Sequence, residues 1–246
     1  MNILEVKDYQ QMSQKAATFI VRKIQDNPFI KLGLATGGTP LGTYRNLIKE
    51  FHENRTTYKN VITFNLDEYV GLSQENKNSY WYYMNEAFFS HIDIKKENIY
   101  IPRGDARELQ EECEQYEAWI TKNGGIDLQL LGLGSNGHIG FNEPGSPFTS
   151  KTRVVNLAPS TIDANARFFQ RDEEVPRRAI SMGISTIMKS NEILLLVSGE
   201  SKREAFKQLL NGEISESFPA SILKKHPRVT VIVDKEAAGK IVVDKV

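Results

Sequence analysis

The chain has 246 residues, enough for one α/β domain with a sizeable core, and a second domain is not required. Basic and acidic residues each total 31, so the formal net charge is zero, and neither a basic excess nor a basic stripe points to nucleic-acid binding. The longest apolar run, at 193–197, is far too short to span a bilayer, and the N-terminus lacks the pattern of a signal peptide.

The number of cysteines limits which disulfides and metal sites the chain can form. The chain has one cysteine, Cys113, which excludes an internal disulfide and a cysteine-based zinc site. Together with the missing signal and membrane segments, this predicts a cytoplasmic protein in a reducing compartment.

Short apolar runs alternate with amphipathic stretches along the chain, the pattern of a mainly parallel sheet covered by helices. In chain order, we predict strands at 2–7, 29–35, 61–66, 126–133, 192–198 and 228–233. Helices are expected between them at 9–26, 41–54, 79–92, 105–123 and 200–210, with a further periodic stretch at 161–169. We found no internal repeat or linker-like segment, which favours a single domain over 1–246.

Three loops follow predicted strands, at 36–40, 67–72 and 134–147. In an open parallel sheet, ligands bind beyond the carboxyl ends of the strands. We therefore expect these three loops to share one edge of the sheet and to form one site.

The first loop contains Gly37, Gly38 and Thr39, followed by Pro40. Adjacent glycines let backbone amides approach a ligand, Thr39 suits an N-cap, and Pro40 suits the first helical position. Free N–H groups at a helix start favour a phosphate, although the same residues are also common in a simple strand-to-helix turn.

The second loop begins with Asp67 and Glu68, directly after an apolar strand. A partly shielded carboxylate can have a raised pKa and act as a base. The alternative is a solvated acidic turn, and this loop alone does not decide between the two.

The third loop carries the strongest signal, because five glycines between 132 and 145 surround His138 and Glu143. Histidine is the usual proton shuttle near neutral pH, and a nearby glutamate can orient its ring. A single histidine is more often a hydrogen-bonded structural residue, but the glycines, the strand end and the carboxylate favour catalysis here. No histidine pair has metal-ligand spacing, so no metal site is expected.

The three loops together resemble the glucosamine-6-phosphate deaminase family. The matching stretches are 36–40, 63–72, 137–144, 165–169 and 198–202. This resemblance covers nearly the whole chain and implies a Rossmann-like α/β fold with helices on both faces, no metal or organic cofactor, and a sugar phosphate as substrate.

The resemblance also implies roles for individual residues. Asp67 is similar to the base that moves a proton between C2 and C1 of the opened sugar, His138 to the group that opens the pyranose ring, and Glu143 to its supporting carboxylate. The phosphate-binding set implied by the resemblance is Gly37, Gly38, Thr39, Arg167 and Lys202. The segment around 150–175 is similar to a mobile lid over the site.

One catalytic position departs from part of the family, in which many members carry Asp where this chain has Asn136. Support for His138 is then expected mainly from Glu143, because an amide brings no charge.

A second departure concerns regulation. Larger family members are hexamers activated by N-acetylglucosamine 6-phosphate, and their pattern places a basic residue and a threonine where Val154, Val155 and Asn156 follow Arg153 here. The chain also stops soon after its last predicted strand. We therefore expect a monomer or small homo-oligomer without this activation.

Two alternatives remain at this point. A 6-phosphogluconolactonase shares the fold and a Gly-His-Ile loop but continues differently after the histidine, without the residues found at 141–144. A non-catalytic sugar-phosphate sensor would keep the phosphate loop but could lose Asp67 or His138, both of which are present.

Overall fold

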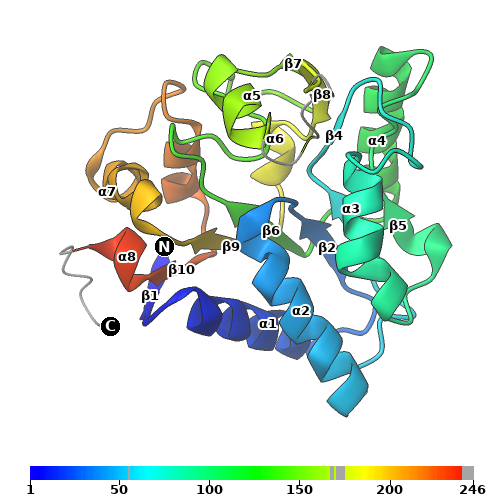
Figure 1. The fold of residues 1–246 in the computed structure, drawn as a ribbon, viewed down its shortest axis with the longest axis horizontal. Helices are drawn as coiled ribbons and strands as arrows, with labels where there is room; N and C mark the ends of the chain where they lie inside the picture. The colour runs from blue at the N-terminus through cyan, green and yellow to red at the C-terminus, as the bar shows by residue number, and fades with distance from the viewer. Residues whose placement is uncertain (55, 167–168, 170–174, 240–246) are drawn as a thin grey trace.

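A seven-stranded parallel sheet forms the centre of the fold (Figure 1). The computed structural model describes residues 1–54, 56–166, 169 and 175–239. The strands of this sheet are β1 (Asn2–Val6), β2 (Lys31–Leu34), β3 (Ile62–Asn65), β5 (Ile99–Tyr100), β6 (Leu128–Gly132), β9 (Glu192–Val197) and β10 (Val229–Asp234). Their order is β1-β10-β9-β6-β2-β3-β5, and every neighbouring pair is parallel, which confirms the predicted fold class.

Helices cover both faces of this sheet. One face packs against α1 (Tyr9–Asp26), α2 (Gly38–Asn54) and α3 (Tyr80–Ala87). The other packs against α4 (Leu109–Lys122), α6 (Ile184–Ile187), α7 (Arg203–Asn211) and α8 (Lys235–Ala238). The alternation within β9 shows why this strand reads as a continuous apolar run. Leu194 and Leu196 enter the first core, whereas Ile193 and Leu195 enter the second.

A small antiparallel sheet of order β4-β8-β7 lies beside the central sheet. It consists of β4 (Asp67–Tyr69), β8 (Arg178–Ser181) and β7 (Arg153–Asn156), and α5 (Pro159–Asn165) follows β7. The sequence predicted a loop at 67–72 and no regular structure near 153, and both expectations were wrong. Three- and four-residue strands with polar residues show no clear period-2 signal, and their pairing depends on partners far away in the chain.

Helix boundaries differ from the predicted ones by a few residues. Asp8 caps α1 as expected, accepting a hydrogen bond from the Gln11 amide at 2.9 Å. Helix α2 begins at Gly38 rather than after Thr39, so Pro40 is its third residue. Helix α3 ends at Ala87, and short 3-10 helices cover Phe89–His91, Lys96–Asn98, Glu200–Lys202 and Pro219–Lys225. In the part of the chain that the structure describes, no helix has both the length and the apolarity needed to cross a membrane.

Candidate active site

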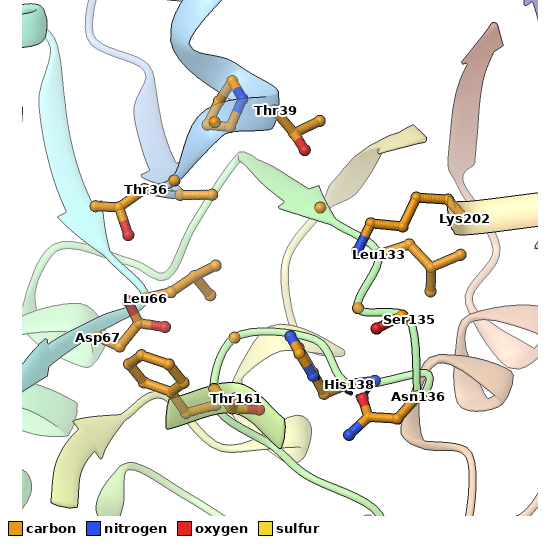
Figure 2. Close-up of a pocket in the computed structure, with 18 of the residues that line it drawn as sticks. Thr36, Thr39, Leu66, Asp67, Leu133, Ser135, Asn136, His138, Thr161 and Lys202 are labelled. Carbon is orange, nitrogen blue, oxygen red and sulfur yellow. Dashed lines mark hydrogen bonds between the residues drawn. The ribbon is translucent and has the colours of Figure 1, made fainter. Parts of the chain in front are cut away.

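A cleft of about 210 Å³ opens at the carboxyl edge of the central sheet (Figure 2). Residues of all three predicted loops line it, which confirms that they share one edge. The side chains and backbone segments around it belong to Ala35, Thr36, Gly37, Gly38, Thr39, Pro40, Leu66, Asp67, Tyr80, Gly132, Leu133, Gly134, Ser135, Asn136, His138, Gly140, Phe141, Thr161 and Lys202. The structure therefore brings together all the predicted site residues it describes except Glu143, which contacts the site from behind.

The turn from β2 into α2 forms one wall of the cleft. Gly37 has φ +90°, a conformation that glycine adopts without strain, and a side chain there would meet no atom within 4 Å. The Tyr83 hydroxyl donates to the Gly37 carbonyl at 2.7 Å, and the Tyr9 hydroxyl donates to the Gly38 carbonyl at 3.0 Å. With the carbonyls held from outside and the first N–H groups of a 17-residue helix at the cleft, this turn is suited to an anion.

A lysine of the short 3-10 helix that follows β9 supplies positive charge to the same cleft. Figure 2 shows Lys202 entering the cleft with its amine toward the loop that holds Leu133 and Ser135. The turn before it is anchored by Asp234, which accepts hydrogen bonds from the Ser198 hydroxyl at 2.5 Å and the Gly199 amide at 3.1 Å. Arg167, the other cation predicted for phosphate binding, lies outside the described residues.

Asp67 lies on β4 at the base of the cleft and is 5% exposed. Its backbone pairs with Ser181 of β8, and a side chain at Gly140 would lie 3.5 Å from its Oδ2 atom. Burial, with a smaller contribution from the charge of Glu68, raises the pKa of the Asp67 carboxyl to about 8. A carboxyl whose pKa lies close to neutral pH, in a cleft that partly excludes water, is suited to take up and return a proton.

The glycine-rich loop places His138 on another wall. Its ring packs so closely on Gly134 that a Cβ there would lie 2.4 Å from the imidazole. The Gly134 amide donates to the His138 carbonyl at 2.9 Å, which closes the turn. The ring position is therefore fixed by backbone on one side.

A hydrogen-bonded chain orients the imidazole from the other side. His138 Nδ1 lies 2.7 Å from Asn136 Oδ1 and 3.5 Å from Glu143 Oε2, and Asn136 Nδ2 donates to the same Oε2 at 2.8 Å. Because the carboxylate accepts from the amide nitrogen, the amide oxygen faces the ring and Nδ1 carries the proton. Nε2 is then the acceptor available for proton transfer. The expectation that Glu143 is the main support needs correction, since Asn136 makes the closer contact and Glu143 orients Asn136.

Glu143 is held as a carboxylate by these contacts. Burial alone would raise the pKa of the Glu143 carboxyl, but hydrogen bonds with His138, Thr161 and Asn136 and the charge of His138 together lower it to about 2. The Thr161 hydroxyl donates to Oε1, the oxygen that does not face the ring pair. Thr161 belongs to α5 and is 6% exposed.

Two cleft residues were missed by the sequence reasoning. Thr161 begins the periodic stretch predicted at 161–169, and one threonine there gives no signal of contact with a distant glutamate. Tyr80 lies in the helix predicted at 79–92 and was not assigned to the site, yet it lines the cleft while its ring stacks on Phe141, with centroids 6.0 Å apart. Among the described residues, no group of three His, Cys, Asp or Glu side chains could hold a metal ion.

These features define a Rossmann-like α/β enzyme fold in which a buried carboxyl, an oriented imidazole and a glycine-containing turn suited to an anion share one cleft at the carboxyl edge of the sheet. A family model described as glucosamine-6-phosphate isomerases/6-phosphogluconolactonase matches residues 7–232. The chain belongs to this family.

Relatives with high sequence identity cover nearly the whole chain. It is 60% identical over 239 residues to a glucosamine-6-phosphate deaminase of Shouchella clausii (strain KSM-K16), covering 97% of each chain. It is 51% identical over 239 residues to glucosamine-6-phosphate deaminase 1 of Bacillus subtilis (strain 168), covering 97% of this chain and 99% of that one.

Solved structures agree with this assignment of the fold. A structure described as a monomeric glucosamine-6-phosphate deaminase of the NagB superfamily superimposes with a TM-score of 0.95 and 51% identity, covering 97% of this chain and 99% of that one. A 6-phosphogluconolactonase from Trypanosoma cruzi has a TM-score of 0.79 at 20% identity, with 98% and 97% covered. The second likeness shows the shared fold alone.

Proposed function

We propose that this protein converts glucosamine 6-phosphate to fructose 6-phosphate and ammonia. The observation that carries the proposal is that a buried carboxyl, an oriented imidazole and an anion-binding turn line one cleft. Relatives more than 50% identical over nearly the full chain, named for this activity, support the same substrate.

The proposed reaction divides between the two proton-transfer groups. His138 Nε2 takes the proton of the anomeric hydroxyl and delivers it to the ring oxygen, so the C1–O5 bond breaks and the pyranose opens to the aldehyde. Asp67 then removes the proton on C2 and returns it to C1. Over the same step O1 gains a proton and the amine loses one, so the aldehyde becomes an alcohol and an imine is left at C2. Water adds to the imine carbon, and ammonia leaves as the ketone forms.

The phosphate is proposed to anchor the substrate at the other end of the cleft. Gly37, Gly38 and Thr39 offer N–H groups at the start of α2, and Lys202 offers a charged donor. Arg167 completes the set by resemblance. Binding energy gained at this remote group can position C1 and C2 against Asp67.

One assay tests the proposal directly. The purified protein should release ammonia from glucosamine 6-phosphate, with fructose 6-phosphate in equal amount. A parallel assay should offer 6-phosphogluconolactone, the substrate of the nearest alternative. Hydrolysis of the lactone without ammonia release would overturn the proposal, and binding of glucosamine 6-phosphate without turnover would favour a sensor.

Substitution of Thr161 by Val should lower kcat/KM by about 10-fold or more, because a hydrogen bond to a charged group contributes about 1.5–3 kcal/mol. Without the hydroxyl, one oxygen of Glu143 loses its donor, and the carboxylate holds Asn136 and His138 less firmly. Thr161→Ser keeps the hydroxyl and should retain most activity. Equal steady-state rates for Val and Ser variants would contradict this role.

Substitution of Lys202 by Ala should raise KM for glucosamine 6-phosphate with a smaller effect on kcat. The lost charge-assisted contact to a dianion corresponds to about 2–5 kcal/mol if it is buried in the complex. Lys207→Ala is the matched control, since Lys207 is an exposed residue of α7 that does not line the cleft. An unchanged KM for Lys202→Ala would remove this residue from the phosphate-binding set.

We also propose that the enzyme acts as a monomer or small oligomer in the cytoplasm and does not respond to N-acetylglucosamine 6-phosphate. Its structural relative is described as monomeric. After Arg153, β7 continues with Val154 and Val155, at the positions where the regulated pattern has a basic residue and a threonine. The Arg153 guanidinium itself donates to Asn142 Oδ1 at 2.9 Å. Substrate saturation should be hyperbolic with and without that compound. Two results together would contradict this proposal. They are a sigmoidal substrate-saturation curve that becomes hyperbolic when the compound is added, and a hexamer-sized particle in light scattering.

The lid expected around 150–175 is likewise a proposal. Its described part contains β7 and α5, and Thr161 of α5 lines the cleft.

A further inference from the structure

Glu68 is a buried carboxylate directly beside the proposed base, and the proposed reaction does not use it. It is 2% exposed and follows Asp67 in the short strand β4. Successive side chains of a strand point to opposite faces. Asp67 therefore faces the cleft, whereas Glu68 points away from it, toward the start of α3.

Three backbone amides converge on this carboxylate. Oε1 accepts from the Tyr69 amide and from the Tyr80 amide, both at 2.8 Å, and Oε2 accepts from the Trp81 amide at 2.9 Å. Tyr80 and Trp81 are the first two residues of α3, whose N–H groups have no partner within the helix. Ser79 caps the next free amide, that of Tyr82, at 3.0 Å. Glu68 thus fixes the N-terminus of α3 to β4.

Helix α3 contacts the active-site cleft through two tyrosines. Tyr80 lines the cleft, its ring centroid is 4.8 Å from that of Tyr69, and its hydroxyl lies 3.3 Å from the Tyr69 hydroxyl. Tyr83 donates to the Gly37 carbonyl of the anion-binding turn at 2.7 Å. A displacement of α3 would therefore move both a wall of the cleft and the turn proposed to bind phosphate.

The charged groups around Glu68 are mostly acidic. Asp67 precedes it, and Asp105, in the segment before α4, also acts on it electrostatically, while Arg103 lies 3.5 Å from Asp105. The phenols of Tyr69 and Tyr80 are the other titratable groups nearby. Burial raises the pKa of the Glu68 carboxyl and the three amide hydrogen bonds lower it; burial is the larger effect, and the pKa is raised to about 7.

We propose that Glu68 is a positioning residue for the reaction: it holds α3 against the cleft, and it keeps a negative charge behind Asp67 that makes Asp67 a stronger base toward the proton on C2. Both parts follow from its place between the base and the helix. The inference rests on the proposed function, because it assigns Glu68 to the proton transfer carried out by Asp67.

The test compares Glu68→Gln with Glu117→Gln. Glu117 is a matched control because its Oε1 accepts from the Thr152 amide, the Thr152 hydroxyl and the Thr186 hydroxyl, away from the cleft. The readout is the pH dependence of kcat/KM for ammonia release, with each profile normalised to its plateau. Loss of the neighbouring charge makes Asp67 easier to ionise. The acidic limb of the pH profile of Glu68→Gln should therefore lie about one pH unit below that of the wild type.

The two parts of the proposal give separate expected results. Glu68→Gln should also raise KM several-fold, since an amide cannot accept from all three N–H groups and α3 loosens against the anion-binding turn. Glu117→Gln should keep the wild-type limb and KM. An acidic limb at the wild-type position in a folded Glu68→Gln protein would overturn the proposal.

A second measurement tests the proposal even if Glu68→Gln does not fold or the wild-type protein releases no ammonia. Carboxyl carbon resonances of the wild-type protein report the ionisation of each acid directly. The Asp67 resonance should titrate in two steps, one coinciding with Glu68. A single step for Asp67 would overturn the electrostatic link, whereas absent ammonia release with two-step titration would count against the proposed function alone.

Discussion

Replacing Asp67 with Asn should reduce kcat by about 100- to 10,000-fold or more, the range typical for removal of a general base. Asn keeps the size of the side chain but cannot accept a proton from C2. Substrate should still bind, because its phosphate is expected to contact the start of α2 and Lys202 rather than β4. Ammonia release gives the rate, and exchange of the C2 hydrogen with deuterated solvent, followed by NMR, gives the proton-transfer step.

Thermal stability separates this loss from unfolding. The pKa of Asp67 is raised from its ordinary value of 3.8 to about 8, so between these values the folded state binds more protons than the unfolded state. The free energy of unfolding therefore falls as pH rises from about 4 to about 8, with the cost of the buried charge fully present above that range. Asp67→Asn removes this cost, and its Tm at pH 8 should be at least that of the wild type. Wild-type exchange at C2 in the variant would show that Asp67 is not the base.

Six of the seven strands of the central sheet could be predicted because they are long enough to carry a pattern, whereas β5 has two residues and was not predicted. The runs that became β6, β9 and β10 are apolar on both faces, and each is followed by turn or helix signals. The same reasoning placed the three loops on one edge, since carboxyl ends of parallel strands coincide. That much of the site follows from topology, before any side chain is positioned.

The small sheet and the contacts behind the site could not be predicted in this way. Strand β4 has three residues, two of them acidic, and its pairing with β8 joins positions more than one hundred residues apart. Thr161 reaches Glu143 only because β7 and α5 fold back over the loop. These contacts depend on tertiary packing, and the residues involved have no local pattern that would distinguish them from ordinary loop residues.

The role of Asn136 shows a different limit. The sequence indicates that the position lacks a charge, and this led to the expectation that Glu143 takes over. In the structure the Asn136 amide lies between His138 and Glu143: it accepts a hydrogen bond from the ring at 2.7 Å and donates one to the carboxylate at 2.8 Å. An amide can do both at once, whereas a carboxylate only accepts. The resulting tautomer of His138, with Nε2 as acceptor, follows from that geometry alone.

Replacing His138 with Gln should lower kcat by about 100- to 10,000-fold, because general acid–base transfer to the ring oxygen is lost. The Gln side chain can hydrogen-bond but has no group that titrates near neutral pH. The cleft keeps Asp67 and the anion-binding turn, so the variant should still bind glucosamine 6-phosphate. Ammonia release and a direct binding measurement test these two expectations.

Isotope effects distinguish the two proton-transfer groups. If His138 opens the ring and Asp67 then moves the C2 proton, the two substitutions make different steps limiting. With substrate deuterated at C2, Asp67→Asn should show a full primary isotope effect on kcat, since removal of that proton is slow. His138→Gln should show an effect smaller than that of Asp67→Asn, because ring opening precedes the isotope-sensitive step and now limits the rate. A full effect in both variants would mean that His138 acts in the same step as Asp67, and the division of roles proposed here would be wrong.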